Sequence, residues 1–121
     1  MTCGGIKPDY DALVIGAGVT GIYQTYLLDK AGMSVLGVDT AEDVGGTWYW
    51  NRYPGCRLDT ESYAYGYFAL NGIIPDWTWS ENFAGQPEML RYVNAAADAM
   101  DVRKHFRFRT KVTSAHFQDD T

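Results

Sequence analysis

A run of regularly spaced glycines constrains the fold of this chain more than any other feature of its sequence. The run, GAGVTG at residues 16–21, follows directly on the apolar segment ALVI at residues 12–15. An uninterrupted apolar segment of this length is typical of a strand that is buried on both faces of a parallel sheet. Because glycine adopts backbone angles that other residues avoid, we expect this strand to lead into a tight turn.

The residues after the glycines predict a helix and then a second strand. Apolar residues recur at helical spacing between Val19 and Ala31, and Gly32 marks the end of the helix. These apolar residues are Ile22, Tyr23, Tyr26 and Leu27. Residues 35–38 are again apolar and are followed by Asp39. Since two strands joined by one helix form a right-handed βαβ crossover, we predict an α/β fold of the Rossmann type with a parallel sheet.

In this setting each glycine has a physical role in binding a dinucleotide. Gly16 permits the tight turn, Gly18 lets the backbone approach the pyrophosphate, and Gly21 lets the helix pack close to the sheet. The free N–H groups and the positive dipole end of the helix would face the phosphates. Asp39 is expected to accept hydrogen bonds from the ribose hydroxyls and to repel a 2′-phosphate. A glycine-rich turn without a ligand is the alternative, and these residues do not decide between FAD and NAD.

The rest of the chain predicts a long aromatic connection and a second helix. Residues 40–82 are rich in aromatic and turn-forming residues, with one short helix expected at residues 61–66. The second helix has Pro87 in its first turn. Its buried face is expected to hold Met89, Val93, Ala96 and Met100.

Two short strands are expected after this helix. Residues 106–110 alternate in polarity like a strand, and residues 112–117 are expected to form another short strand. Residues 118–121 have the composition of a hairpin turn whose returning strand is absent from the 121 residues.

Composition and charge exclude several classes of function. The net charge of −5 and the scattered Lys and Arg residues argue against a nucleic-acid surface. No segment predicts a signal peptide or a membrane span. Cys3 and Cys56 match no metal-binding pattern, so no metal site is expected, and we interpret both as reduced thiols of a cytoplasmic protein rather than as a disulfide. We predict a flexible N-terminus at residues 1–9 and an incomplete domain over residues 10–121.

The most specific string in the chain is GGTWYWNRYPG at residues 45–55. Together with the glycine run and the segment DTES at residues 59–62, it resembles the N-terminal part of Baeyer–Villiger monooxygenases, which are class B flavin monooxygenases of the cyclohexanone and phenylacetone monooxygenase type. The resemblance extends over residues 9–121 and includes the later segment QPEMLRYVN.

The resemblance implies a fold, a reaction and two cofactors. Members of the family hold FAD in a first dinucleotide domain and NADPH in a second, and they convert ketones to esters or lactones with O₂ through a flavin peroxide. Transferred by position, the cofactor-binding residues are Gly16, Gly18, Thr20, Gly21, Asp39, Gly46, Thr47, Trp48, Trp50, Arg57, Asp59, Tyr65 and Val112. Arg57 and Asp59 fall where the family's chain also lies near the nicotinamide cofactor.

Physical interpretations of the same residues differ in part. The paired glycines let the backbone pass close to a flat ring or ribityl chain. The aromatic residues can keep water from a flavin. Alternatively, Trp48 and Trp50 simply form part of the hydrophobic core. Asp59 precedes the expected short helix and can be its N-cap. The resemblance gives Asp59 a catalytic role as well, in holding an arginine that stabilises negative charge in the reaction.

The 121 residues contain only part of the family's machinery. The catalytic arginine, the second glycine motif and the NADPH domain are absent from them, so we expect this chain to be inactive alone and to need the remaining C-terminal part of the enzyme. Two alternatives stay open: a flavin monooxygenase that oxidises nitrogen or sulfur, and a non-catalytic nucleotide-binding remnant.

Overall fold

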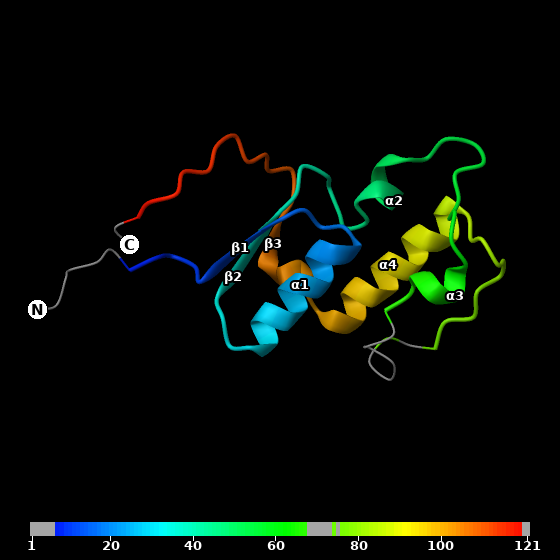
Figure 1. Ribbon diagram of the computed structural model, residues 1–121, viewed down its shortest axis with the longest axis horizontal. Coiled ribbons are helices and arrows are strands. Elements are labelled where there is room, and N and C mark those ends of the chain that lie inside the picture. The colour runs from blue at the N-terminus through cyan, green and yellow to red at the C-terminus, as the bar shows by residue number, and fades with distance from the viewer. Residues whose placement is uncertain (1–6, 68–73, 75, 120–121) are drawn as a thin grey trace, which may run out of the picture.

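The first part of the fold is the βαβ unit that the glycine run predicts. The computed structural model describes residues 7–67, 74 and 76–119. Strand β1 (Ala12–Ile15) is followed by helix α1 (Val19–Lys30) and strand β2 (Val35–Val38). The two strands lie side by side (Figure 1) and pair in parallel; in this register Leu13 is opposite Leu36. The predicted α/β class and the order of these elements are confirmed.

Helix α1 packs against the sheet through a narrow face. Ile22 and Thr25 are fully buried. The hydroxyl of Thr25 donates a hydrogen bond to the Gly21 carbonyl oxygen at 2.8 Å, which allows a polar side chain to be buried there. Leu27 was expected on the buried face, but its side chain is exposed. The buried face is therefore narrower than the apolar pattern suggests.

A third strand extends the sheet beyond β2. Strand β3 (Phe106–Arg107) pairs in parallel with β2, which gives the order β1-β2-β3. The Phe106 ring lies over Gly37, where an added Cβ would come within 2.4 Å of the ring. The strand is shorter than the predicted 106–110, and the left-handed backbone of Arg109 (φ 52°) follows soon after it.

The strand predicted at residues 112–117 is wrong. Residues 111–118 have no regular secondary structure. A strand needs a partner for its backbone hydrogen bonds, and this segment finds none among the described residues. Phe117 is accordingly almost fully exposed. Asp119 lies in a turn, while residues 120–121 of the predicted hairpin turn lie outside the described residues.

The second long helix, α4 (Gln86–Met100), lies beside α1 (Figure 1). Its predicted apolar face is confirmed, since Met89, Val93, Ala96 and Met100 are all buried. Pro87 is in the first turn, and the helix ends at Asp101, which adopts the left-handed conformation. The short 3₁₀ helix η2 (Arg103–His105) then leads into β3.

The aromatic connection contains two short helices. The expected helix at residues 61–66 is α3 (Ser62–Tyr65). Helix α2 (Thr47–Trp50), within the GGTWYWNRYPG segment, was not expected. Much of this connection packs around Tyr92 of α4, whose ring centroid lies 5.4 Å from that of Trp77 and 4.8 Å from that of Trp79. Aromatic packing therefore orders a segment that has little regular secondary structure.

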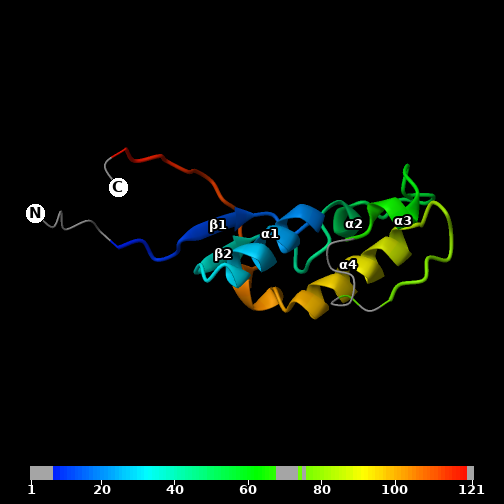
Figure 2. The same cartoon turned by 60° about the horizontal axis from the view of Figure 1, so that its bottom comes forward.

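The two faces of the sheet differ. Helix α1 packs on one face, whereas Leu13 and Ile15 of β1 are 54% and 63% exposed on the other. The prediction that β1 is buried on both faces is therefore wrong for this part of the chain. The molecule is elongated, with both ends of the described chain on the side of β1 away from α2 and α3 (Figure 2). Among the described residues, no helix has the length and apolarity that crossing a membrane requires.

Candidate dinucleotide site

The glycine loop has the geometry that its sequence predicts. Gly16 has a φ of 112°, and its N–H donates to the Val38 carbonyl oxygen at 2.8 Å. A Cβ at Gly21 would lie 1.8 Å from the Gly16 carbonyl oxygen and 3.7 Å from Val14 in the sheet. The third glycine thus lets the first turn of α1 pack against the loop itself as well as close to the sheet.

Asp39 holds the glycine loop in place. Its Oδ2 accepts a hydrogen bond from the Ala17 N–H at 2.6 Å, and its Oδ1 accepts one from the Ala41 N–H at 2.7 Å. Each carboxylate oxygen has a further lone pair that can accept a bond from a ligand hydroxyl. The structure therefore adds an anchoring role to the ribose contact expected from the sequence.

The paired glycines of the aromatic segment contact this loop directly. The Gly45 N–H donates to the Ala17 carbonyl oxygen at 3.0 Å. Gly46 has a φ of 56°, and a Cβ there would lie only 2.7 Å from the Gly18 Cα. The sequence suggested that the pair allows close approach to a cofactor, and in the structure the close approach is between the two glycine motifs.

A pocket of about 380 Å³ opens at this contact. Its lining includes the predicted site residues Gly16, Gly18, Thr20, Gly21, Thr47 and Tyr65. The N-terminus of α1 borders it, and Gly18 is the N-cap with no side chain covering the free N–H groups. These groups and the positive end of the helix dipole favour a phosphate or another anion.

A second, smaller pocket of about 190 Å³ adjoins the first through Ile15 and Gly16. Asp39 and Val112 line it, so two predicted site residues that are far apart in the sequence meet here. The backbone N–H of Thr110 donates to the Asp39 carbonyl oxygen at 2.9 Å, which carries the chain over the end of β2 toward Val112. Together the pockets offer an anion site next to a carboxylate.

The two predicted tryptophans have different environments. Trp48 is buried, as the core interpretation expects, and its indole N–H donates to the Tyr65 hydroxyl at 3.2 Å beside the larger pocket. Trp50 is 58% exposed and makes an edge contact with the Tyr49 ring. The core interpretation thus holds for Trp48 and fails for Trp50, and only Trp48 contacts the pocket wall.

Arg57 and Asp59 lie outside both pockets. Arg57 is bound to Glu81 at 2.7 Å in an exposed ion pair and also donates to the Phe83 carbonyl oxygen. Asp59 is exposed, and within the described part of the chain no hydrogen bond or ion pair is found for its carboxylate. The N-cap of α3 is Glu61 and makes no side-chain capping bond, so the N-cap interpretation of Asp59 is wrong.

Two tyrosines, the buried Tyr92 and the partly buried Tyr67, brace the start of α1. The Tyr67 hydroxyl donates to the Val19 carbonyl oxygen at 2.6 Å, and the Tyr67 N–H donates to the Tyr92 hydroxyl at 2.8 Å. Burial raises the pKa of both phenols above the ordinary value of 10. Both groups therefore stay neutral and act as hydrogen-bonding struts.

The described residues were compared with the expectations for metal ligands and cysteines. No cluster of His, Cys, Asp or Glu among those residues could hold a metal ion. Cys56 is a buried free thiol, while Cys3 lies outside the described residues.

Sequence reasoning missed several pocket residues. Gln24 faces the larger pocket one turn after Thr20, so helical spacing from a predicted residue could have indicated it. Thr40, Thr110 and Lys111 line the smaller pocket. Thr40 directly follows Asp39 and the other two precede Val112, so only adjacency to predicted residues could have pointed to them.

Comparisons with known proteins agree with this geometry. The sequence profile of the NAD(P)-binding Rossmann-like domain family matches residues 14–71. The chain is 76% identical over 114 residues to the 2-oxo-Δ3-4,5,5-trimethylcyclopentenylacetyl-CoA monooxygenase of Pseudomonas putida, covering 94% of this chain and 21% of the relative. It is 46% identical over 117 residues to a Baeyer–Villiger monooxygenase of Pseudooceanicola batsensis, covering 96% and 22% respectively.

A crystal structure of OTEMO in complex with FAD and NADP superposes with a TM-score of 0.91 at 75% identity, covering 95% of this chain and 22% of that one. Over nearly its whole length, this chain is similar to a part of Baeyer–Villiger monooxygenases. It spans about a fifth of the length of these monooxygenases. A phenazine N-monooxygenase of Lysobacter antibioticus is 42% identical over 114 residues, so a nitrogen-oxidising enzyme shares this segment of the Baeyer–Villiger monooxygenases.

Proposed function

We propose that this chain is the FAD-binding part of an NADPH- and O₂-dependent monooxygenase that converts ketones to esters or lactones. The observation that carries the proposal is the pair of adjoining pockets at the N-terminus of α1, with Asp39 in the smaller one. The similarity to a structure solved with FAD and NADP supports FAD at this position. When bound, FAD would supply the redox chemistry by which NADPH and O₂ oxidise the ketone.

The residues of this chain would bind and orient the cofactor. The free N–H groups after Gly18 would hold the diphosphate, with Thr20 exposed beside them in the first turn of α1. The free lone pairs of Asp39 would accept the ribose hydroxyls, and its charge would disfavour a 2′-phosphate. Thr47 and Tyr65 line the larger pocket. Trp48, bonded to Tyr65, would help keep water from the flavin side of the site.

Asp59 and Arg57 would act at the junction with the rest of the enzyme. Asp59 is an exposed carboxylate without a partner in the described structure. Such a group is available to hold an arginine from another part of the polypeptide, which would stabilise negative charge during the reaction. Arg57 is half exposed despite its ion pair with Glu81, so it could also contact the nicotinamide cofactor.

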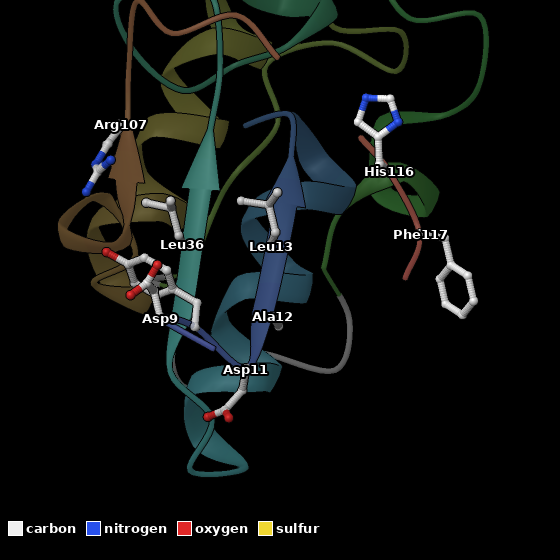
Figure 3. A pocket seen from close by; sticks show the side chains of 9 residues that line it. Asp9, Asp11, Ala12, Leu13, Leu36, Arg107, His116 and Phe117 are labelled. Carbon is white, nitrogen blue, oxygen red and sulfur yellow. The ribbon is translucent and has the colours of Figure 1, made fainter. Parts of the chain in front are cut away.

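The remaining C-terminal part of the enzyme would cover the open face of the sheet. Leu13 and Leu36 lie on this face with Arg107 at its edge, as Figure 3 shows, and Phe117 of the C-terminal segment lines the same open pocket. The exposed fractions of Leu13 and Phe117, 54% and 91%, are high for side chains of their size in a finished core. Parallel sheets of the Rossmann type are covered on both faces, which supports this assignment. The free thiol of Cys56 supports a cytoplasmic location.

The proposal is tested on the full-length protein. We expect the purified protein to bind FAD and to consume NADPH in step with a cyclic ketone. An Asp39→Asn variant should bind FAD about tenfold more weakly, since it loses charge-assisted bonds to the loop and to the ribose. A Glu42→Gln variant, which alters an exposed carboxylate three residues after Asp39, is the matched control and should bind FAD normally.

Turnover with different substrates separates the alternatives. Preferred oxidation of amines or sulfides over ketones would favour the nitrogen- or sulfur-oxidising alternative. The similarity to a phenazine N-monooxygenase supports this alternative. A full-length protein that takes up no FAD would favour the non-catalytic remnant.

A further inference from the structure

The loop between β2 and α2 carries three carboxylates, Asp39, Glu42 and Asp43, and leads from Asp39 in the smaller pocket to Gly45 in the larger one. Negative charges near a diphosphate would weaken its binding unless they are bonded elsewhere. Asp39 is bonded to backbone N–H groups, as described above. The other two are paired with arginines from beyond α4: Glu42 with Arg109 at 3.0 Å and Asp43 with Arg103 at 2.9 Å.

Arg103 is the more firmly held of the two arginines. Its side chain is 31% exposed, against 72% for Arg109. Its Nη2 donates to the Asn94 Oδ1 at 2.5 Å and its Nη1 pairs with Asp98, so α4 fixes the guanidinium from one side while Asp43 binds it from the other. Burial opposes the charge of Arg103, but the two carboxylates outweigh that effect and raise its pKa. The guanidinium is therefore always charged and in a defined orientation.

The contact with Asp43 continues to the glycine loop. The oxygen that binds Arg103, Asp43 Oδ1, also accepts a hydrogen bond from the Val44 N–H at 2.8 Å. The next residue, Gly45, is bonded through its N–H to the glycine loop, and Gly46 packs against Gly18.

Helix α4 supports the same stretch through an apolar contact. A Cβ at Gly45 would lie 2.8 Å from Leu90 Cδ1, so this side chain fills the space next to the glycine. Leu90 also accepts a hydrogen bond at its carbonyl oxygen from Asn94, the residue that holds Arg103. One face of α4 thus fixes both the guanidinium and the glycine pair.

We propose that Arg103 is a positioning residue for the dinucleotide pocket: by holding Asp43 it keeps Gly45 and Gly46 against the glycine loop and so sets the wall that faces the diphosphate. Arg103 itself lines neither of the two pockets and acts through the loop. The nature of the ligand, FAD, rests on the proposed function. The connection from Arg103 to the glycine loop stands on the contacts alone.

Affinity for FAD in the full-length protein is the first test. Arg103→Met removes the charge and the three bonds but keeps much of the aliphatic side chain, and we expect it to weaken FAD binding about tenfold. Arg103→Lys keeps the charge and should restore part of the affinity. The matched control is Lys104→Met, which removes a neighbouring exposed ion pair with Asp101 and should leave the affinity unchanged.

Amide hydrogen exchange of the protein without FAD is the second test. In Arg103→Met the N–H of Gly45 should exchange faster, while that of Met89, which is bonded within α4, should keep its rate. Equal acceleration at both amides with unchanged FAD affinity would mean that Arg103 only stabilises the fold, and this would overturn the proposal. Normal Gly45 exchange and normal affinity would overturn it as well.

Two further outcomes are distinguishable. If Arg103→Met does not fold, the Asp43→Asn variant is measured instead. Its amide oxygen can still accept the hydrogen bond from the Val44 N–H, but the negative charge that binds Arg103 is lost. The same faster exchange at Gly45 is then expected. If the unaltered protein binds no FAD, the proposed function fails, while the exchange rate of Gly45 still decides whether Arg103 positions the loop.

Discussion

The glycine loop and the aromatic segment meet where Gly46 packs on Gly18, but they differ in how many of their polar groups are satisfied. At the glycine loop, both oxygens of Asp39, which follows β2, are bonded to backbone N–H groups. In the aromatic segment, Trp50 is 58% exposed and Asp59 has no partner in the described structure. Around the glycine loop, the polar groups bond to backbone groups of this chain. Around Asp59, by contrast, side chains remain available to bond with other parts of the polypeptide.

The largest effect is expected from a substitution inside the loop. Gly21→Ala would place a Cβ 1.8 Å from the Gly16 carbonyl oxygen, and since this oxygen belongs to the backbone the loop must move. We expect a loss of at least about 3 kcal/mol in the free energy of unfolding, measured by urea denaturation. Gly85→Ala is the control, because its φ is −74° and its contacts would be ordinary; it should cost within about 1 kcal/mol. Similar losses in both variants would mean that the loop is not the tightly packed region.

Substitutions of two glycines with positive φ distinguish the effect of backbone strain from the effect of the contact between Gly46 and Gly18. Gly46→Ala and Gly55→Ala both force a side chain onto a residue with positive φ, 56° and 81°. Only at Gly46 does the new Cβ meet a neighbour, Gly18 Cα at 2.7 Å. Gly55→Ala should cost about 1–2 kcal/mol from strain. Gly46→Ala should cost more and should also abolish FAD binding in a flavin-fluorescence titration, which Gly55→Ala should retain. Retained FAD binding in Gly46→Ala would show that the two regions are independent.

A substitution in the aromatic segment should leave stability almost unchanged. Asp59→Ala removes an exposed side chain that makes no bond in the described structure, so the melting temperature should correspond to a change within about 0.5 kcal/mol. Turnover of the full-length enzyme should nevertheless fall by about 100-fold if Asp59 holds a catalytic arginine. A marked loss of stability with normal turnover would contradict the expectation that Asp59 acts in turnover and not in the stability of the fold.

The smallest effect is expected at the end of the sheet opposite the loop. Asp11 Oδ2 accepts hydrogen bonds from the N–H and the hydroxyl of Ser34, and the N–H contributes most to lowering the Asp11 pKa below 3.8. Because the folded state has the lower pKa, the interaction contributes fully above about pH 4, the value for an unfolded chain, and is lost as the pH falls through the lowered pKa of the folded state. Asp11→Asn should therefore melt at a slightly lower temperature than the unaltered protein at pH 7, and this difference should disappear as the pH is lowered through that pKa. A difference in melting temperature that persists at low pH would contradict this role of the Asp11 carboxylate.

Features that depend on residues close in the sequence were predicted correctly, whereas features that depend on distant partners were not. The βαβ unit, the buried face of α4 and helix α3 were predictable because each depends on residues that are close in the sequence. The strand at residues 112–117 failed because a strand depends on a partner elsewhere, and alternation alone does not supply one. The N-cap interpretation of Asp59 failed because α3 begins later, after Glu61.

The sequence by itself determined the dinucleotide loop of this protein. The loop is specified by backbone angles and by close contacts between near neighbours, which only glycine allows at Gly16 and Gly21. Only the tertiary structure showed that Asp39 anchors the glycine loop, that Gly46 packs on Gly18 and that Arg103 of η2 binds Asp43 in the loop between β2 and α2. These contacts join residues 22 to 60 positions apart, and no local pattern encodes which distant partners the folded chain brings together.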